Sequence, residues 1–368
     1  MTNRESITSG QMSLLFFTFM TGSAIVNIPA PIIAFAKNDA WLSLIISCTI
    51  GGLLLSCILY LNKHYPGLTF VEYSLKAVGT WITFLLLIPF VAYLFHMCAG
   101  IVLDVDLFMT SSLMDETPMY IFSIVVLLAA AITAHVGIEA MARMFIIIIT
   151  LMLCFVVVIF IVALPDYRPE QLLPILSQGI KPVLHGAYFT YGFPYAEVIV
   201  FAMLLAFVRK TNNNELNRSM YMALIINGVI LITSVVCTIM MFGPMAGERK
   251  YSLYQFARII QVVDIIERIE SVIAMALIAG SYMKATITLY ALTLAISQLL
   301  RLRDYRILIF PTALIIVLLT LLLSEGMTKW EESVASIHPL YVSISYVLPL
   351  LVLTLVTWIK SKRKQSSV

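Results

Sequence analysis

The sequence predicts an all-α polytopic membrane protein with ten transmembrane helices. Apolar residues make up 61% of its 368 residues, charged residues only 12%, and the mean hydropathy is +0.98. A soluble domain of this size could not bury so many apolar side chains, because surface-to-volume scaling limits the size of its core. A membrane-spanning helix needs about 20 mainly apolar residues, and ten stretches of this kind follow one another along the chain.

Asp, Glu, Lys and Arg are absent from these ten stretches, apart from Glu197 in the sixth and Lys284 in the eighth. The stretches are residues 11–36, 40–62, 77–103, 117–137, 144–165, 182–208, 219–247, 271–300, 307–324 and 333–359. Between the seventh and the eighth, the apolar spacing of residues 251–269 predicts a short amphipathic helix at the membrane interface.

An even number of spans places both termini on the same side, and the distribution of basic residues predicts that this side is cytoplasmic. Segments on the side of the termini hold 14 of the 23 basic residues, and cytoplasmic loops carry an excess of Lys and Arg. They are Arg4, Lys63, Lys76, Arg143, Arg209, Lys210, Arg218, Arg301, Arg303, Arg306, Lys360, Lys362, Arg363 and Lys364.

Several function classes are disfavoured by composition and motifs. A net charge of +3 gives no global basic field for nucleic acid. The five cysteines fall inside apolar stretches without ligand spacing, so we expect no disulfide, metal or cofactor. The sequence contains no Gly-rich phosphate loop, HExxH or GxSxG, so no catalytic residue is predicted and the chain is not expected to be an enzyme.

The first and sixth stretches each contain a glycine followed by a proline near the middle. The pairs are Gly22 with Pro29, and Gly192 with Pro194. Proline removes an amide donor and clashes with the preceding turn, whereas glycine tolerates the non-helical angles that result. Irregular backbone at membrane depth is tolerated only where protein or a wet cavity satisfies it. Two ordinary proline kinks are the alternative, but their corresponding positions favour a binding site.

The two breaks open equivalent five-helix halves of one transmembrane domain, residues 1–368. Because five is odd, a repeated half must insert upside down, which predicts an inverted repeat of about residues 11–165 and 182–360. Transporters built this way bind substrate between their two broken helices. Half-helix amides can hold a carboxylate there, and exposed carbonyls can hold an ammonium group.

Glu197 and Lys284 are candidate binding residues because a charge at bilayer depth is costly unless it is paired or wetted. The alternatives are a structural ion pair or a lysine that reaches the interface; whether the two residues meet cannot be read from the sequence. Tyr93, in the middle of the third stretch, could gate a cavity or simply pack in the core. Asp104 and Asp106, near the outer end, are expected to be solvated.

The chain resembles a known family, the B subunits of endospore germinant receptors within the amino acid–polyamine–organocation superfamily. The resemblance covers nearly the whole chain. It is carried by residues 22–29, His64-Tyr65-Pro66-Gly67 with Phe70-Val71-Glu72-Tyr73, residues 191–198, and Glu267-Arg268-Ile269-Glu270-Ser271.

The resemblance implies a LeuT-like bundle in the inner membrane of a bacterial spore. It also implies a small nutrient ligand, often an amino acid, and two protein partners, a membrane-embedded A subunit and a lipoprotein C subunit. The pocket that it implies comprises Gly22, Ser23, Ala24, Ile25, Asn27, Tyr93, Tyr191, Gly192, Phe193, Tyr195, Glu197 and Lys284.

Two residues depart from the family pattern. Ala24 stands where a second small glycine is frequent, which restricts the backbone slightly. Lys284 stands where a neutral residue is usual, which suggests either an anionic ligand or a built-in cation. The expected function is nutrient sensing; a secondary amino acid or amine transporter and a gated water or ion conduit remain alternatives. An intramembrane enzyme is disfavoured by the missing catalytic spacing.

Overall fold

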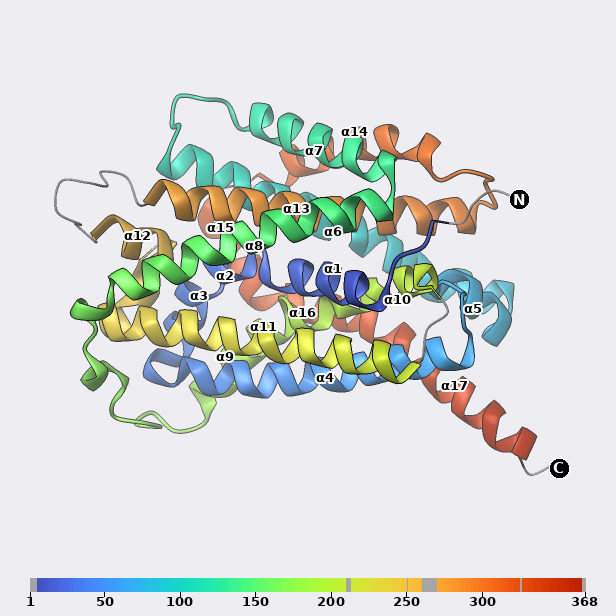
Figure 1. The fold of residues 1–368 in the computed structure, drawn as a ribbon, viewed down its shortest axis with the longest axis horizontal. Helices are drawn as coiled ribbons and strands as arrows, with labels where there is room; N and C mark the ends of the chain where they lie inside the picture. Colours follow the sequence, from blue (N-terminus) through green and yellow to red (C-terminus); the bar gives the residue numbers. More distant parts are fainter. Residues whose placement is uncertain (1–4, 210–212, 250, 260–269, 325, 366–368) are drawn as a thin grey trace.

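The computed structural model describes residues 5–209, 213–249, 251–259, 270–324 and 326–365. The described chain is a bundle of helices running roughly along one axis, with both ends of the chain at the same end of the bundle (Figure 1). Within the described residues, ten helical segments are long and apolar enough to cross a membrane. The predicted all-α architecture of ten spans is therefore confirmed.

The first half of the chain contains eight α-helices. They are α1 (Ser9–Thr21), α2 (Ala24–Asn27), α3 (Pro29–Ala36), α4 (Ala40–His64), α5 (Phe70–Val78), α6 (Thr80–Ser112), α7 (Met119–Val136) and α8 (Ile138–Val162). The second half contains α9 (Lys181–Gly192), α10 (Phe201–Leu204), α11 (Asn213–Phe242), α12 (Ser252–Ile259), α13 (Glu270–Leu299), α14 (Arg306–Leu323), α15 (Met327–Ser336), α16 (His338–Val342) and α17 (Leu348–Gln365).

Short 3₁₀ turns connect or continue these helices. They are η1 (Lys37–Asp39), η2 (Leu164–Asp166), η3 (Pro169–Leu172), η4 (Tyr195–Val200), η5 (Leu205–Phe207) and η6 (Gly243–Glu248). The segment 251–269, predicted to be an amphipathic helix, begins with the helix α12, and its residues 260–269 lie outside the described part of the chain.

Burial separates a central group of spans from an outer shell. The window of the sixth span, Lys181–Phe207, is 89% buried, whereas those of Ile138–Val162 and Arg306–Leu323 are each 28% buried. The outer helices turn apolar side chains such as Ile147, Leu314 and Leu322 outward, as a helix in contact with lipid tails must. Neither broken span lies in this shell, so the irregular backbone of both is enclosed by protein.

Both predicted breaks are present. In the first span, α1 ends at Thr21, and Gly22 and Ser23 form a turn before α2 and α3. In the sixth, α9 ends at Gly192 and the chain continues as the 3₁₀ turn η4 rather than as α-helix. Pro194 precedes η4 in the sixth span, and Pro29 begins α3 and so separates it from α2 in the first; at both positions a missing amide costs no helical hydrogen bond.

The tenth span differs from the prediction that it begins near residue 333. Met327–Ser336 is a separate helix, α15, and the span itself starts at α16. Pro339 is the reason, since its ring and missing amide prevent α15 from continuing through it. A π-helical turn over Ser343–Val347 then interrupts the span before α17. This irregular turn lies beside the sixth span, where it contacts η4.

Candidate functional site

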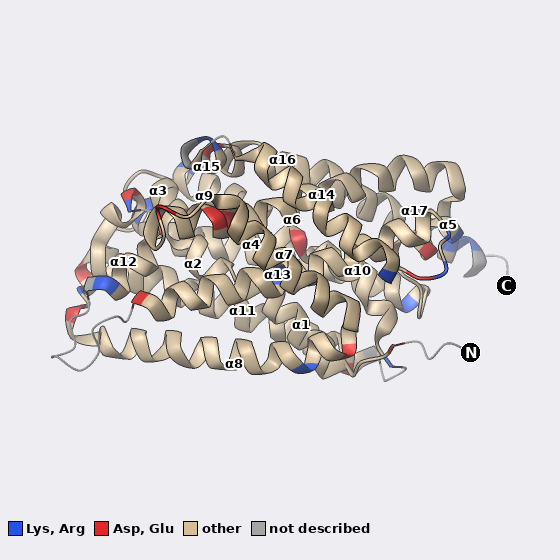
Figure 2. Ribbon diagram, turned by 90° about the horizontal axis from the view of Figure 1, so that it is seen from above, with Lys and Arg blue, Asp and Glu red and all other residues tan. Residues whose placement is uncertain are grey.

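A cavity of about 520 Å³ lies between the broken first span, α6, the broken sixth span and the α15–α16 segment. It extends to the exposed residues Glu248, Arg249 and Glu332. Glu332 belongs to α15 and the other two precede α12, and both helices lie at the end of the bundle opposite the chain termini (Figure 2). Residues from both breaks line it. We call this space the central cavity and this end of the bundle the cavity end.

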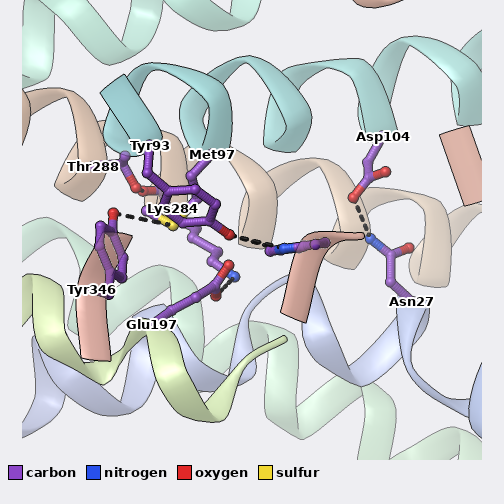
Figure 3. Close-up of polar contacts among 9 residues, drawn as sticks. Asn27, Tyr93, Met97, Asp104, Glu197, Lys284, Thr288 and Tyr346 are labelled. Atoms are coloured by element: carbon purple, nitrogen blue, oxygen red, sulfur yellow. Dashed lines mark hydrogen bonds and ion pairs between the residues drawn. The ribbon is translucent and has the colours of Figure 1, made fainter. Parts of the chain in front are cut away.

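Glu197 and Lys284 form an ion pair at the floor of the central cavity. Lys284 Nζ donates to Glu197 Oε2 at 2.5 Å, and the two side chains are 0% and 2% exposed (Figure 3). Glu197 comes from η4, immediately after the sixth-span break, and Lys284 comes from the middle of α13. Glu197 lines the cavity, whereas Lys284 lies behind Glu197 and does not line the cavity.

Aromatic rings surround the lysine of this pair. Lys284 Nζ lies 4.1 Å from the centre of the Phe193 ring and 5.1 Å from that of Phe19. Ring faces carry partial negative charge, so they attract the ammonium group where water is absent. Carboxylate and rings together make a buried cation tolerable at this depth. The sequence left open whether Glu197 and Lys284 meet, and in the structure they do.

Asp104 links three elements in the wall of the central cavity. Its Oδ1 accepts a hydrogen bond from Trp330 Nε1 of α15 at 2.6 Å. Its Oδ2 accepts one from Asn27 Nδ2 of α2 at 3.3 Å, the bond drawn in Figure 3. Trp330 also packs against Gly100 one turn earlier on α6: a Cβ at Gly100 would lie 2.7 Å from Trp330 Cη2. Trp330 is therefore fitted closely into the wall.

The expectation of solvation near the outer end is wrong for Asp106, whereas Asp104 is half-buried at the wall of the open cavity. Asp104 lines the central cavity in the bonds just described. Asp106 is fully buried on the other side of α6 and accepts a hydrogen bond from Ser123 Oγ of α7. The cause is the length of α6, which runs to Ser112 and so carries both residues inside the bundle.

Tyr93 lies beside the central cavity and is fully buried. Its hydroxyl group contacts the ring nitrogens of His338 of α16, the shorter distance being 2.8 Å to Nδ1. Below it, the Tyr346 hydroxyl group donates to Met97 Sδ at 3.9 Å. His338 and Met97 line the cavity, so Tyr93 supports the wall through His338 rather than forming its surface.

The first-span break is packed against α13. A Cβ at Gly22 would lie 2.9 Å from the carbonyl oxygen of Gly280, so the two backbones approach as closely as glycine allows. Ser23, Ala24 and Ile25 are buried beyond this contact, and Asn27 lines the cavity.

The predicted residues of the sixth span point in different directions. Phe193 and Glu197 line the central cavity. Tyr191 shares a hydrogen bond with Ser343 Oγ at 2.8 Å, and Gly192 packs against Pro339 of α16. Tyr195 does not line the cavity and packs against α4 instead. A Cβ at Gly51 of α4 would lie 2.9 Å from Tyr195 Cδ1.

The opposite end of the bundle is tied together by Glu5, in a group that we call the Glu5 latch. Glu5 Oε2 accepts from the Ile138 amide at 2.9 Å and from the Tyr290 hydroxyl group at 3.5 Å. Its Oε1 accepts from Arg306 Nη2 at 2.7 Å and from the Tyr305 hydroxyl group at 3.2 Å. Burial and the Glu5 charge raise the pKa of Tyr305 above its usual value, which keeps this hydroxyl group protonated as a donor.

The latch joins the N-terminal segment to both halves of the chain. Ile138 begins α8, where the positive helix end favours a carboxylate, and Tyr290 and Arg306 belong to α13 and α14. Next to it, the Ile7 amide donates to Phe207 O and the Arg209 amide to Ile7 O, both at 2.9 Å. These bonds close the bundle at the terminal end.

Sequence reasoning missed His96, Trp330 and His338 as lining residues of the central cavity. Trp330 lies outside the predicted tenth span, and no periodicity connects it with α6. His338-Pro339 offered the one available signal, because it is a further break in a span that otherwise reads as continuous helix.

Comparison with protein families and with curated proteins gives a consistent result. The sequence profile of a family described as spore germination protein, Spore_permease, matches residues 6–326. Spore germination protein KB of Bacillus subtilis (strain 168) is 24% identical over 369 residues, which cover 99% of this chain and 98% of that protein.

Solved structures with the same fold are transporters. Mhp1, a nucleobase-cation-symport-1 family transporter in a closed conformation, matches with a TM-score of 0.71 at 12% identity, covering 93% of this chain and 76% of its own. MhsT in complex with L-phenylalanine matches with a TM-score of 0.67 at 11% identity, covering 97% and 98%. These likenesses confirm the expected LeuT-like arrangement with broken first and sixth helices.

Proposed function

The chain belongs to the spore germination protein family, and we propose that it is the nutrient-sensing, permease-like subunit of a spore germinant receptor. The ligand is a small molecule, with an amino acid as the first candidate, bound in the central cavity at the middle of the membrane. The observation that carries this proposal is a cavity of about 520 Å³ bordered by both helix breaks.

Two groups of residues contribute to the proposed binding site. Asn27, Phe193 and Glu197 line the central cavity and contact the ligand. The others set the position of the breaks or support the walls: Gly22, Ser23, Ala24, Ile25, Tyr93, Tyr191, Gly192, Tyr195 and Lys284. The unwound backbone between α9 and η4 offers carbonyl and amide groups to a zwitterion. The amino acid bound by MhsT, a protein of the same fold, supports the choice of candidate.

The proposed location is the spore inner membrane, with both termini in the cytoplasm. Figure 2 shows Lys and Arg near α5 and α17 at the terminal end, in agreement with the positive-inside rule. With this orientation, the cavity end faces away from the cytoplasm. A nutrient arriving from outside the membrane therefore meets the open mouth of the cavity.

Ligand binding signals by favouring one packing of the bundle over another, since only a difference in affinity between two states shifts their equilibrium. The broken spans suit this role because their halves can tilt separately about the breaks. The change would pass to the partners expected of such a receptor, an A subunit and a lipoprotein C subunit.

A secondary transporter for an amino acid or amine is the second candidate function, and the fold shared with solved transporters favours it. Accumulation of a labelled substrate in proteoliposomes against its gradient would establish transport. A gated conduit for water or ions requires both ends to open together, and swelling of proteoliposomes without nutrient would reveal it.

The binding proposal is tested by filling the central cavity. Ala30 lines the cavity, so Ala30→Trp places a large ring in the ligand space. Ala129→Trp is the matched control, because Ala129 of α7 is exposed on the outer surface. Spores that lack the native gene and carry each variant are compared in their germination response to nutrient concentration. We expect Ala30→Trp to raise the half-maximal concentration at least about tenfold, equivalent to about 1.4 kcal/mol.

The result is interpreted at matched levels of protein in the spore membrane. If Ala30→Trp and Ala129→Trp give the same dose-response, the nutrient does not bind in this cavity.

A further inference from the structure

Aromatic rings line the central cavity in two pairs that come from different elements. Phe35 of α3 and Phe189 of α9 have ring centres 6.0 Å apart. His96 of α6 and Trp330 of α15 have ring centres 6.1 Å apart. All four line the cavity, and within the described residues no ring of one pair contacts a ring of the other. We call the part of the cavity that both pairs border the ring slot.

The rings of the slot are held in place by their surroundings. On one side, Phe35 packs against Phe189, and α3 runs along α9. On the other side, Trp330 Nε1 donates to Asp104 Oδ1, and the Trp330 ring fits closely against Gly100. Groups that are fixed before a ligand arrives lose less freedom when it binds. The ring slot is therefore a preformed surface for a ligand group.

The wall around these rings is also largely apolar. A group placed in the slot is removed from water, which is favourable for apolar surface in proportion to its area. A ligand ring gains further from offset or edge-to-face contacts with the rings of the slot. A large apolar group therefore gains more there than a methyl group does. Apolar lining residues from the first span and α6 are Val26, Ala30, Pro31, Met97, Ile101 and Leu107.

The charged residues of the cavity are engaged or exposed. Glu197 accepts a hydrogen bond from Lys284. Asp104 accepts hydrogen bonds from Trp330 and Asn27, and the charge of Lys284 acts on it as well. A charged ligand group in the ring slot would lose its hydration among rings and apolar side chains, which is costly. The other charged lining residues are exposed at the rim: Glu248, Arg249 and Glu332.

The ring slot adjoins the backbone that suits the common part of an amino acid. Phe193 is the C-cap of α9, and Phe189 lies one helical turn before it. Both line the cavity. The unwound backbone after Phe193 offers carbonyl and amide groups to an ammonium and a carboxylate group. A zwitterion held at this break has the ring slot within reach of its side chain.

We infer that the central cavity selects an amino acid with a large apolar side chain, aromatic or branched aliphatic, and that the ring slot binds this side chain. The inference rests on the proposed function and specifies its ligand class. The anionic ligand suggested by Lys284 is not required, because Glu197 pairs with its ammonium group and Lys284 does not line the cavity. Phe35 and Phe189 are specificity-determining residues in this assignment.

Leucine and asparagine are a matched pair of probes, because their side chains are similar in shape but differ in polarity. Saturable binding of tritiated L-leucine and of tritiated L-phenylalanine is measured on the purified full-length protein in nanodiscs. Unlabelled L-alanine and L-asparagine are then tested as competitors. We expect L-leucine and L-phenylalanine to bind at least about tenfold more tightly than L-alanine, equivalent to about 1.4 kcal/mol. L-asparagine should compete no better than L-alanine.

The variant Phe35→Ala tests the ring slot itself. Phe35 is only half-buried, so its ring can be removed without opening the core. We expect the preference for L-leucine over L-alanine to fall at least about threefold, with the affinity for L-alanine nearly unchanged. A general loss of structure would instead lower both affinities together. Phe155→Ala is the matched control, with the same change at an exposed position of α8, and should keep the preference.

The outcomes decide the inference in two parts. A preference for L-leucine that Phe35→Ala reduces and Phe155→Ala keeps supports it. The ligand class is overturned if neither tritiated amino acid binds saturably, or if L-alanine or L-asparagine competes as well as L-leucine. A preference that Phe35→Ala leaves intact overturns the role of the ring slot. The proposed function fails separately, if Ala30→Trp leaves the nutrient response unchanged whatever the ranking of these amino acids.

Discussion

At the terminal end of the bundle, Glu5 ties the N-terminal segment to α8, α13 and α14 through four polar contacts. At the cavity end, a space of about 520 Å³ reaches down to Glu197 between the halves of two broken helices. The two ends share the same central helices but differ in what fills the space between them. Polar bonds close one end, whereas the other leaves room for a ligand.

This difference between the two ends indicates where the packing of the bundle can change. A bundle closed at one end and hollow at the other is one of the two states that alternating access requires. In the proposed orientation, the open end of this state faces away from the cytoplasm, the side from which the proposed ligand would enter. A sensor of this design would respond when the ligand draws the cavity end together and the latch is released, and the following predictions test the parts of that comparison.

The ion pair between the two ends should produce the largest effect. Lys284→Met leaves Glu197 buried without its partner, and losing one partner of a buried pair typically costs about 3–5 kcal/mol. The double variant Lys284→Met with Glu197→Gln removes both charges and should recover most of that loss. Thermal unfolding of the purified protein measures the effect, with Lys63→Met, at an exposed lysine, as the control. If the double variant is no more stable than Lys284→Met, the loss of stability does not come from leaving Glu197 charged and unpaired.

The packing of Trp330 against α6 should have the next largest effect and should be confined to the cavity end. In Gly100→Ala the new Cβ would lie 2.7 Å from Trp330 Cη2, so Trp330 must move and its bond to Asp104 weakens. We expect a loss of about 1–3 kcal/mol in the free energy of unfolding, as for overpacking elsewhere, and a shifted nutrient dose-response.

Gly52→Ala is the matched control, because the nearest atom to its new Cβ is Leu224 Cδ2 at 3.7 Å. Identical unfolding temperatures and germination curves for the two alanine variants would contradict a close fit of Trp330.

Releasing the latch should have the smallest effect on stability but a local effect on dynamics. Glu5→Gln removes the charge that Arg306 and Tyr305 bind. We expect a loss of about 1–2 kcal/mol, because charge-assisted hydrogen bonds are stronger than neutral ones but Glu5 and Arg306 are partly exposed and screened by solvent. Hydrogen exchange should rise at residues 5–9 and at the start of α8, and stay constant in α15. The control Glu215→Gln, at an exposed glutamate, should change hydrogen exchange at neither end of the bundle. If Glu5→Gln raises exchange in α15 as much as at residues 5–9, the two ends do not respond separately.

The sequence predicts the fold well because its strongest signals are local. Stretches without charge mark the ten spans, and the glycine–proline pairs mark the two breaks. Where each span begins is harder to predict, since residues 333–336 carry no charge and read as the start of the tenth span, although they are the last turn of α15 and the span itself starts at α16.

The candidate site can be predicted only in part from such local sequence signals. The breaks identify Asn27, Phe193 and Glu197 as residues near one another, because they lie within a few positions of the irregular backbone. The pairing of Lys284 with Glu197 depends on how α13 is rotated, which hydropathy does not report when a helix is apolar on every face. Tyr195 faces α4 because η4 is a 3₁₀ turn, so a register of 3.6 residues per turn would misplace it.

Hydrogen exchange of the full-length protein with and without the germinating nutrient tests the central claim most directly, that a ligand in the central cavity changes the packing of both ends. The account predicts slower exchange in α15 and α3 around the cavity and faster exchange at residues 5–9 and at the start of α8. Exchange that stays the same at both ends at a nutrient concentration that germinates the spores would contradict it.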